Sequence, residues 1–130
     1  RFDRQLDIEV MEGVPDGSLD MLIANHVLEH VNDRAALRAI FRVLKRGAVA
    51  LLTVPLVEGW DETLEGEGLS ERERTLQLGD PDHRRFYGRD FRDRVREAGF
   101  ELSEYPAVEP DVSRHALHRG ERLFLARRPG

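Results

Sequence analysis

The chain has 130 residues, a length that suits one domain with a single hydrophobic core, and residues 1–130 are treated as that domain. It contains no cysteine, which excludes disulfides and thiolate metal sites, and no signal-peptide pattern opens it, which favours a cytoplasmic protein. The net charge of −5 and the interleaved Arg and Glu residues argue against a nucleic-acid partner. No apolar run reaches the roughly 18 residues that cross a bilayer, so no membrane partner is expected either.

The first half of the chain predicts three short strands separated by turns. Residues 6–10 alternate apolar and acidic side chains, which favours a short strand, and Gly and Pro residues at 13–17 predict a turn. The nearly continuous apolar run Leu19–Ala24 is typical of a strand covered on both faces in a parallel sheet. Ala48–Val54 is a second run of this kind, and Pro55 ends it.

A helix is predicted between these two runs, over residues 34–44. Asn32 or Asp33 can cap its N-terminus, and Gly47 is expected to end it. Its apolar side chains fall on one face at helical spacing: Leu37, Ile40, Phe41 and Leu44. The strand–helix–strand unit indicates an α/β fold, in which ligands bind beyond the carboxyl ends of the parallel strands.

The second half begins with a long segment rich in Asp, Glu and Gly, at residues 56–69. Its irregular pattern predicts a loop, and a loop of this length is often functional. Ser70 and Glu73 form a capping box for a short helix at residues 71–77.

The last elements are a helix and two strands. The apolar face of the helix consists of Phe91, Val95 and Ala98, and Gly99 ends it. Residues 100–105 and 122–127 are expected to pair as the last two strands.

Several segments, taken in order, resemble motifs of the class I S-adenosylmethionine-dependent methyltransferases. That family often carries an Asp-Gly-Ser-Phe-Asp turn, a Leu-Glu-His segment and an Arg-Val-Leu-Lys-Pro-Gly-Gly turn. Here these correspond to Asp16–Asp20, Leu28–His30 and Arg42–Ala48. Asp82–Phe91 and Glu97–Phe100 are similar to later parts of the family, so the likeness covers most of residues 6 to 100.

The resemblance implies a partial Rossmann-like methyltransferase sheet, mostly parallel with an antiparallel C-terminal strand. It also implies S-adenosylmethionine as cofactor, a small-molecule methyl acceptor, and a lid or substrate loop at residues 56–69. The chain departs from the family at Arg46 and Ala48, opens on Arg1, and has no Gly-x-Gly-x-Gly turn. We therefore expect the C-terminal part of a methyltransferase, with an incomplete cofactor site and little activity of its own.

The resemblance assigns four residues to the cofactor. Asp7 is placed to meet the adenine amino group and Ile8 to lie beside the ring; the alternative is a solvated Asp next to a core Ile. Asn25 and His26 follow a buried strand, where they would face the methionine half of the cofactor and the reacting methyl group. The alternative for this pair is to stabilise a turn.

Four side chains are candidates for catalysis, as bases or as substrate contacts: His26, His30, His83 and Tyr87. Methyl transfer needs mainly alignment, with a base only when the nucleophile is protonated. His30 has the alternative of a structural hydrogen bond with Glu29. His83, Tyr87 and the arginines between them could bind an anionic substrate or form a solvated loop packed by aromatic rings.

Two other functions remain open. His26, Glu29 and His30 have the His-x-x-Glu-His spacing of inverted zinc proteases. The segment directly follows a strand and lacks a third downstream ligand, so no metal is expected.

A non-catalytic module that keeps the fold for association is the nearer alternative. In the family's sheet, the Met21–Ala24 strand pairs with Ala48–Val54 and with a first strand that is missing here. An unpaired apolar edge of this kind predicts self-association.

Overall fold

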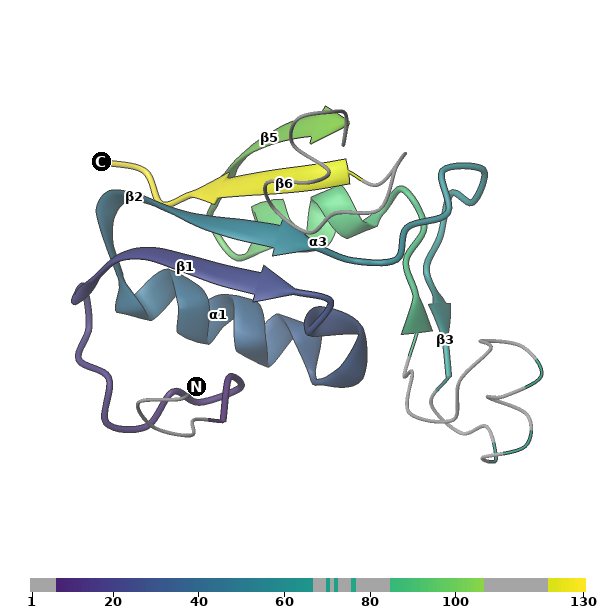
Figure 1. Ribbon diagram of the computed structural model, residues 1–130, viewed down its shortest axis with the longest axis horizontal. Helices are drawn as coiled ribbons and strands as arrows, with labels where there is room; N and C mark the ends of the chain where they lie inside the picture. Colours follow the sequence, from purple (N-terminus) through teal and green to yellow (C-terminus); the bar gives the residue numbers. More distant parts are fainter. Residues whose placement is uncertain (1–6, 67–69, 71, 73–75, 77–84, 107–121) are drawn as a thin grey trace.

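The computed structural model describes residues 7–66, 70, 72, 76, 85–106 and 122–130. Its centre is a four-stranded sheet in the order β1-β2-β6-β5, formed by Leu19–Asn25, Leu44–Thr53, Arg122–Arg127 and Glu101–Pro106 (Figure 1). β1 and β2 are parallel, whereas β6 is antiparallel to both β2 and β5. Three strands therefore run one way and the C-terminal strand runs against them, which confirms the predicted α/β sheet.

Helix α1 (Asp33–Val43) connects β1 to β2. Asn32 is its N-cap, because its side-chain oxygen accepts a hydrogen bond from the Ala35 amide at 3.1 Å. Sequence reasoning was wrong about its end. Gly47 lies within β2, with φ +83° and its amide donating to the Arg128 carbonyl at 2.7 Å. The last two carbonyls of α1, those of Arg42 and Val43, instead accept hydrogen bonds from the amides of Gly17 and Ser18, so the acidic turn before β1 closes the helix.

The covered face of the sheet packs on α1 and on α3 (Phe91–Glu97). Ala24, Leu52 and Phe124 are register partners on neighbouring strands, and each is at most 1% exposed. The Phe91 and Phe124 rings meet edge to face with centroids 4.9 Å apart, which fixes α3 against β6. The final strand pair is thereby confirmed, as are the buried positions Leu37 and Ile40 of α1 and Phe91 and Val95 of α3, whereas the predicted helix residue Leu44 begins β2.

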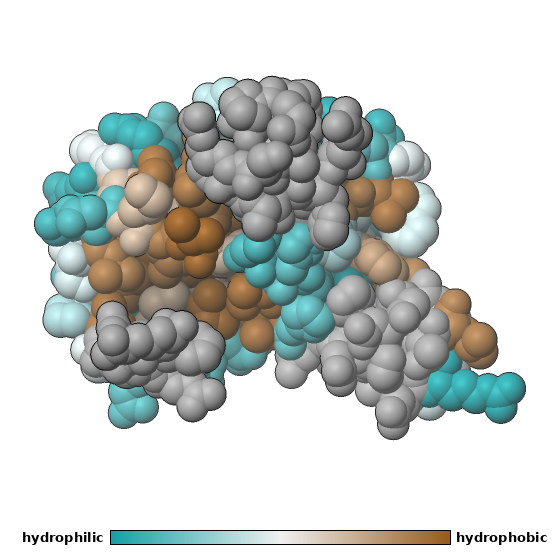
Figure 2. Space-filling view, viewed as in Figure 1, coloured by the Kyte–Doolittle hydropathy of each residue, from teal (hydrophilic) through white to brown (hydrophobic). Residues whose placement is uncertain are grey.

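The opposite face of the sheet is open where β1 runs. Met21 and Ile23 are 53% and 67% exposed, and Tyr105 on β5 is 50% exposed. In Figure 2 hydrophobic side chains gather on the side where β1 and β2 run in Figure 1. Within the described residues, β1 pairs with β2 alone, so it lies at an edge of the sheet.

The prediction of a strand at residues 6–10 is wrong, because residues 8–10 form a turn. The Asp7 carbonyl accepts hydrogen bonds from Val10 and Met11, and the Asp7 side chain accepts one from the Glu9 amide at 2.9 Å. This hydrogen bond between side chain and backbone favours a turn rather than an extended strand.

Residues 56–66 contain more structure than a loop. Leu64–Glu65 (β3) pairs with Arg85–Phe86 (β4) in an antiparallel two-stranded sheet. The Thr63 hydroxyl donates to Asp90 at 2.5 Å and accepts from the Gly88 amide at 3.2 Å. The helix predicted at residues 71–77 lies outside the described residues apart from Arg72 and Leu76, both helical.

Candidate active site

The candidate site lies where the parallel strands β1 and β2 end side by side. Asn25 is the register partner of Thr53, and the Thr53 hydroxyl donates a hydrogen bond to the Asn25 side-chain oxygen. The chain then turns at His26, whose φ is +54° and whose amide donates to the Thr53 carbonyl at 2.9 Å. A left-handed backbone is costly for a residue with a side chain, and such strain concentrates at functional sites.

A buried carboxylate lies behind two accessible imidazoles. Glu29, in the short 3₁₀ helix η1 (Leu28–His30), is only 1% exposed. Its Oε2 atom lies 3.6 Å from His26 Nδ1 and 3.8 Å from His30 Nε2. About a third of each histidine side chain is exposed, 35% for His26 and 37% for His30. The arrangement can stabilise a positive charge on either ring, which is what a histidine base requires.

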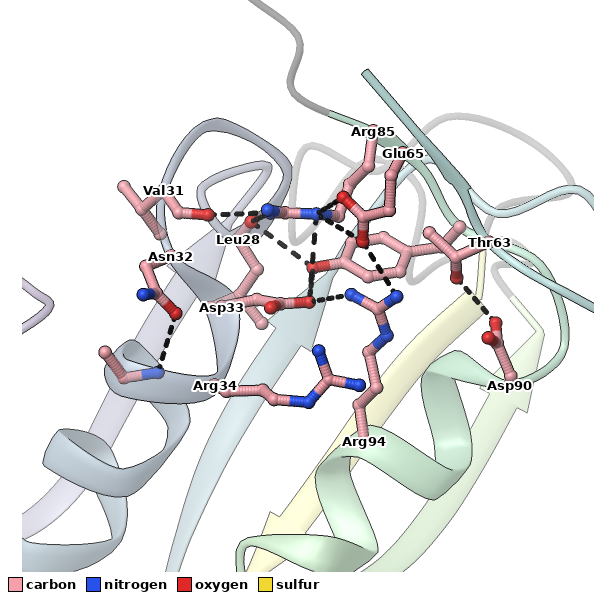
Figure 3. A network of polar contacts seen from close by, with 12 residues as sticks. Leu28, Val31, Asn32, Asp33, Arg34, Thr63, Glu65, Arg85, Asp90 and Arg94 are labelled. Carbon is pink, nitrogen blue, oxygen red and sulfur yellow. Dashed lines mark hydrogen bonds and ion pairs between the residues drawn. The ribbon is translucent and has the colours of Figure 1, made fainter. Parts of the chain in front are cut away.

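A network of ion pairs lies beside this turn, in which Asp33, Arg85 and Arg94 are buried and Glu65 is partly exposed (Figure 3). Arg94 of α3 contacts Asp33 at 2.6 Å and Glu65 at 2.8 Å. Arg85 of β4 contacts Glu65 at 3.0 Å and approaches Asp33 at 3.9 Å. Sequence reasoning missed this network, because the four charges come from four separate elements and no spacing along the chain links them.

Tyr87 belongs to that network. Its ring is fully buried, and its hydroxyl donates to Asp33 at 2.7 Å and approaches the Leu28 carbonyl at 3.3 Å. Burial, together with the charge of Asp33, raises the pKa of the Tyr87 hydroxyl above its ordinary value. This geometry favours a structural role over the catalytic one predicted from the sequence.

Asp33 remains ionised within the network. Burial alone would raise the pKa of its carboxyl group, but the hydrogen bonds from Tyr87 and Arg94 and the charges of Arg85 and Arg94 outweigh burial. The net effect holds the pKa of Asp33 below its ordinary value of 3.8.

The other predicted site residues are placed as follows. Asp7 is exposed and Ile8 packs against the core. Their turn reaches the candidate site through Glu9, whose carboxylate accepts the Asn32 amide at 3.0 Å. The segment with Asp7 and Ile8 is thereby tied to the start of α1, next to η1. His83 lies outside the described residues.

The described residues do not support the zinc alternative. Among them, no group of three or more His, Asp or Glu side chains is arranged to hold a metal ion. The two imidazoles instead approach one oxygen of Glu29.

In the described part of the chain, no helix has the length and hydrophobicity needed to span a bilayer.

The family model for the methyltransferase domain matches residues 1–105. The chain belongs to this family. The resemblance to class I S-adenosylmethionine-dependent methyltransferases is thereby confirmed. Among curated proteins, no sequence matches the chain.

Solved structures share the fold at low sequence identity. A chain from the complex of the Haloferax volcanii Trm112 methyltransferase activator with a methyltransferase has a TM-score of 0.66 and 15% identity over 95% of this chain. The [4+2]-cyclase SpnF has a TM-score of 0.67 and 18% identity over 95% of this chain. Haemonchus contortus phosphoethanolamine N-methyltransferase 2, solved with S-adenosyl-L-methionine, has a TM-score of 0.60 and 13% identity over 95% of this chain. The chain spans 60%, 55% and 36% of their respective lengths.

Proposed function

We propose that this chain forms the C-terminal part of an S-adenosylmethionine-dependent methyltransferase that acts on a small-molecule acceptor. The observation that carries the proposal is the convergence of Asn25, His26 and Glu29 at the carboxyl ends of two parallel strands. In open α/β sheets this edge is where ligands bind. Because one fold neighbour is a cyclase, the fold alone does not determine the reaction, and the proposal rests on the family match together with the site.

The residues present fit a cationic cofactor. Glu29 Oε1 is buried and finds no hydrogen-bond partner among the described residues. An uncompensated carboxylate oxygen favours a positive charge nearby, and the sulfonium of S-adenosylmethionine carries one. The Asn25 carboxamide and the strained His26 backbone would hold the methionine half, while Asp7 and Ile8 would contact the adenine. When bound, the cofactor supplies an electrophilic methyl group.

The chain's own contribution to transfer is alignment and proton removal. His26 presents Nδ1 to Glu29, so we assign Nε2 as the atom that accepts a proton from a hydroxyl or ammonium acceptor. Glu29 then stabilises the resulting imidazolium. His30 contacts the same Glu29 oxygen and is the second candidate for this role. The segment 56–69, with its acidic side chains, remains the proposed lid or substrate loop.

Calorimetry with S-adenosylmethionine tests the proposal on this chain. We expect no binding in the micromolar range, because the glycine turn that lets backbone approach the cofactor is absent from the sequence. Micromolar affinity would refute that account of an incomplete site.

A nuclear magnetic resonance titration at millimolar cofactor locates the weak site. The amides of Asn25 and His26 should shift first, and Asn25→Ala should weaken binding by about 1 kcal/mol, the net worth of a typical hydrogen bond. Arg38→Ala, on the exposed side of α1, is the matched control and should change nothing. Shifts centred instead on the groove between α1 and α3, lined by Arg34, Arg38 and Glu97, would contradict the proposed site.

A further inference from the structure

We propose that Arg85 is a positioning residue, which holds the η1 turn and thereby places Glu29 and His30 in the candidate site. The inference rests on the proposed function for the identity of the site. It adds a residue that lies on another element, more than 50 positions along the chain. Arg85 touches neither imidazole in the described contacts and acts through the backbone of the turn.

The geometry is specific to one guanidinium nitrogen. Arg85 Nη1 donates to the Leu28 carbonyl and to the Val31 carbonyl, both at 2.7 Å. These two carbonyls bracket Glu29 and His30 in the sequence. The Arg85 side chain is 7% exposed, and its Nε is held at the other end by Glu65 at 3.0 Å. Figure 3 shows the guanidinium lying between the Leu28 and Val31 carbonyls on one side and Glu65 on the other.

The η1 turn has little of its own to hold it. It is three residues long, and its N-cap residue makes no side-chain hydrogen bond. A backbone bond from the His30 amide to the Val27 carbonyl at 3.0 Å closes its start. Short 3₁₀ segments have poor hydrogen-bond geometry and unsatisfied carbonyls, so their conformation depends on outside donors. Arg85 is such a donor, because its Nη1 reaches both carbonyls while its Nε is bonded to Glu65. The rigid, planar spacing of these donors is not reproduced by an ammonium group on a flexible stem.

Arg94 provides a matched control within the same network. It is 8% exposed and contacts Asp33 and Glu65, as Arg85 does. In the described contacts it donates to neither carbonyl of η1. Arg94→Lys should therefore disturb the ion network to a similar degree while leaving the turn in place.

The experiment compares Arg85→Lys with Arg94→Lys in the full 130-residue chain. Amide hydrogen exchange is measured at His30, which reports the turn, and at Leu52, which reports the core. We expect Arg85→Lys to accelerate His30 exchange by about tenfold over Arg94→Lys through local opening, with Leu52 affected equally in both variants. The ring resonances of His26 and His30 should shift in Arg85→Lys alone.

Equal His30 exchange in the two variants would overturn the proposal, because Arg85 would then act only through overall stability. If Arg85→Lys fails to fold, the proposal is tested on the wild-type chain instead. Scalar coupling across the hydrogen bonds from Arg85 Nη1 to the Leu28 and Val31 carbonyls supports the proposal, and its absence overturns it. Neither readout needs cofactor or turnover, so failure of the methyltransferase proposal would appear separately, in the binding experiments above.

Discussion

The two faces of the sheet are built from similar side chains and have different surroundings. On the covered face, Ala24, Leu52 and Phe124 are essentially inaccessible beneath α1 and α3. On the other face, Met21 and Ile23 of the same strand β1 are more than half exposed. Successive residues of a strand point to opposite faces, so a single step along β1 moves an apolar side chain from core to surface.

The difference shows that β1 has the composition of a strand covered on both sides. Buried parallel strands read as continuous apolar runs, and Met21–Ala24 is such a run. In the described residues, helices cover only one face of the sheet at β1. The apolar side chains on its other face remain exposed to water, so they contribute little to the free energy of folding.

The largest expected effect separates the two faces directly. Phe124→Ala should lower the free energy of unfolding by about 3–5 kcal/mol, because it leaves a cavity beneath α3. Leu37→Ala on α1 should cost about 2–5 kcal/mol for the same reason. Ile23→Ala on the open face and the surface change Arg38→Ala should each cost less than about 0.5 kcal/mol. Urea denaturation measures all four, and equal midpoints for Phe124→Ala and Ile23→Ala would remove the distinction between the faces.

A second effect comes from the ion network between α1, α3 and the β3–β4 pair, in which Asp33, Arg85 and Arg94 are buried. Asp33→Asn should destabilise the protein by about 3 kcal/mol at neutral pH, since it leaves two buried arginines short of a carboxylate. The pKa of Asp33 is lowered by folding, so its stabilisation is complete above its ordinary pKa of 3.8. That stabilisation is lost as the pH falls through the folded-state value.

The measurement is the free energy of unfolding of wild type and Asp33→Asn between pH 7 and pH 2. The gap between the two proteins should narrow below about pH 4, where the unfolded carboxyl group takes up its proton. A gap that stays constant across this range would show that Asp33 does not titrate as the network requires.

Periodicity and local chemistry predicted most of the fold. The spacing of Leu37 and Ile40 predicted the buried face of α1, because this spacing is a local property of the helix. The sequence also limited the cap to Asn32 or Asp33, and Asn32 is the residue that caps it. The end of α1 was missed because its carbonyls are satisfied by Gly17 and Ser18, residues that precede the helix by a whole strand.

The candidate site was predictable only in part. Asn25 and His26 could be named because they directly follow the apolar run that ends at Ala24. The burial of Glu29 and the reach of Arg85 to η1 depend on contacts between distant segments, which no spacing along the chain encodes. The same holds for Tyr87, for which the sequence left open a base or a packed loop residue, while its hydroxyl meets Asp33 in the interior.

The smallest change, one exposed side chain, tests whether the open face is an interface. We expect the chain to self-associate at micromolar concentration, because among the described strands β1 is an apolar edge strand that pairs on one side only. Ile23→Lys should shift sedimentation toward a monomer, since a charge on an edge strand opposes pairing. Tyr105→Lys is the matched control, on the same face but on β5, where the side chain is 50% exposed. Dissociation by Ile23→Lys alone locates the contact at β1, whereas dissociation by both variants spreads it across the sheet. A wild-type chain that sediments as a stable monomer at micromolar concentration would contradict the expected self-association.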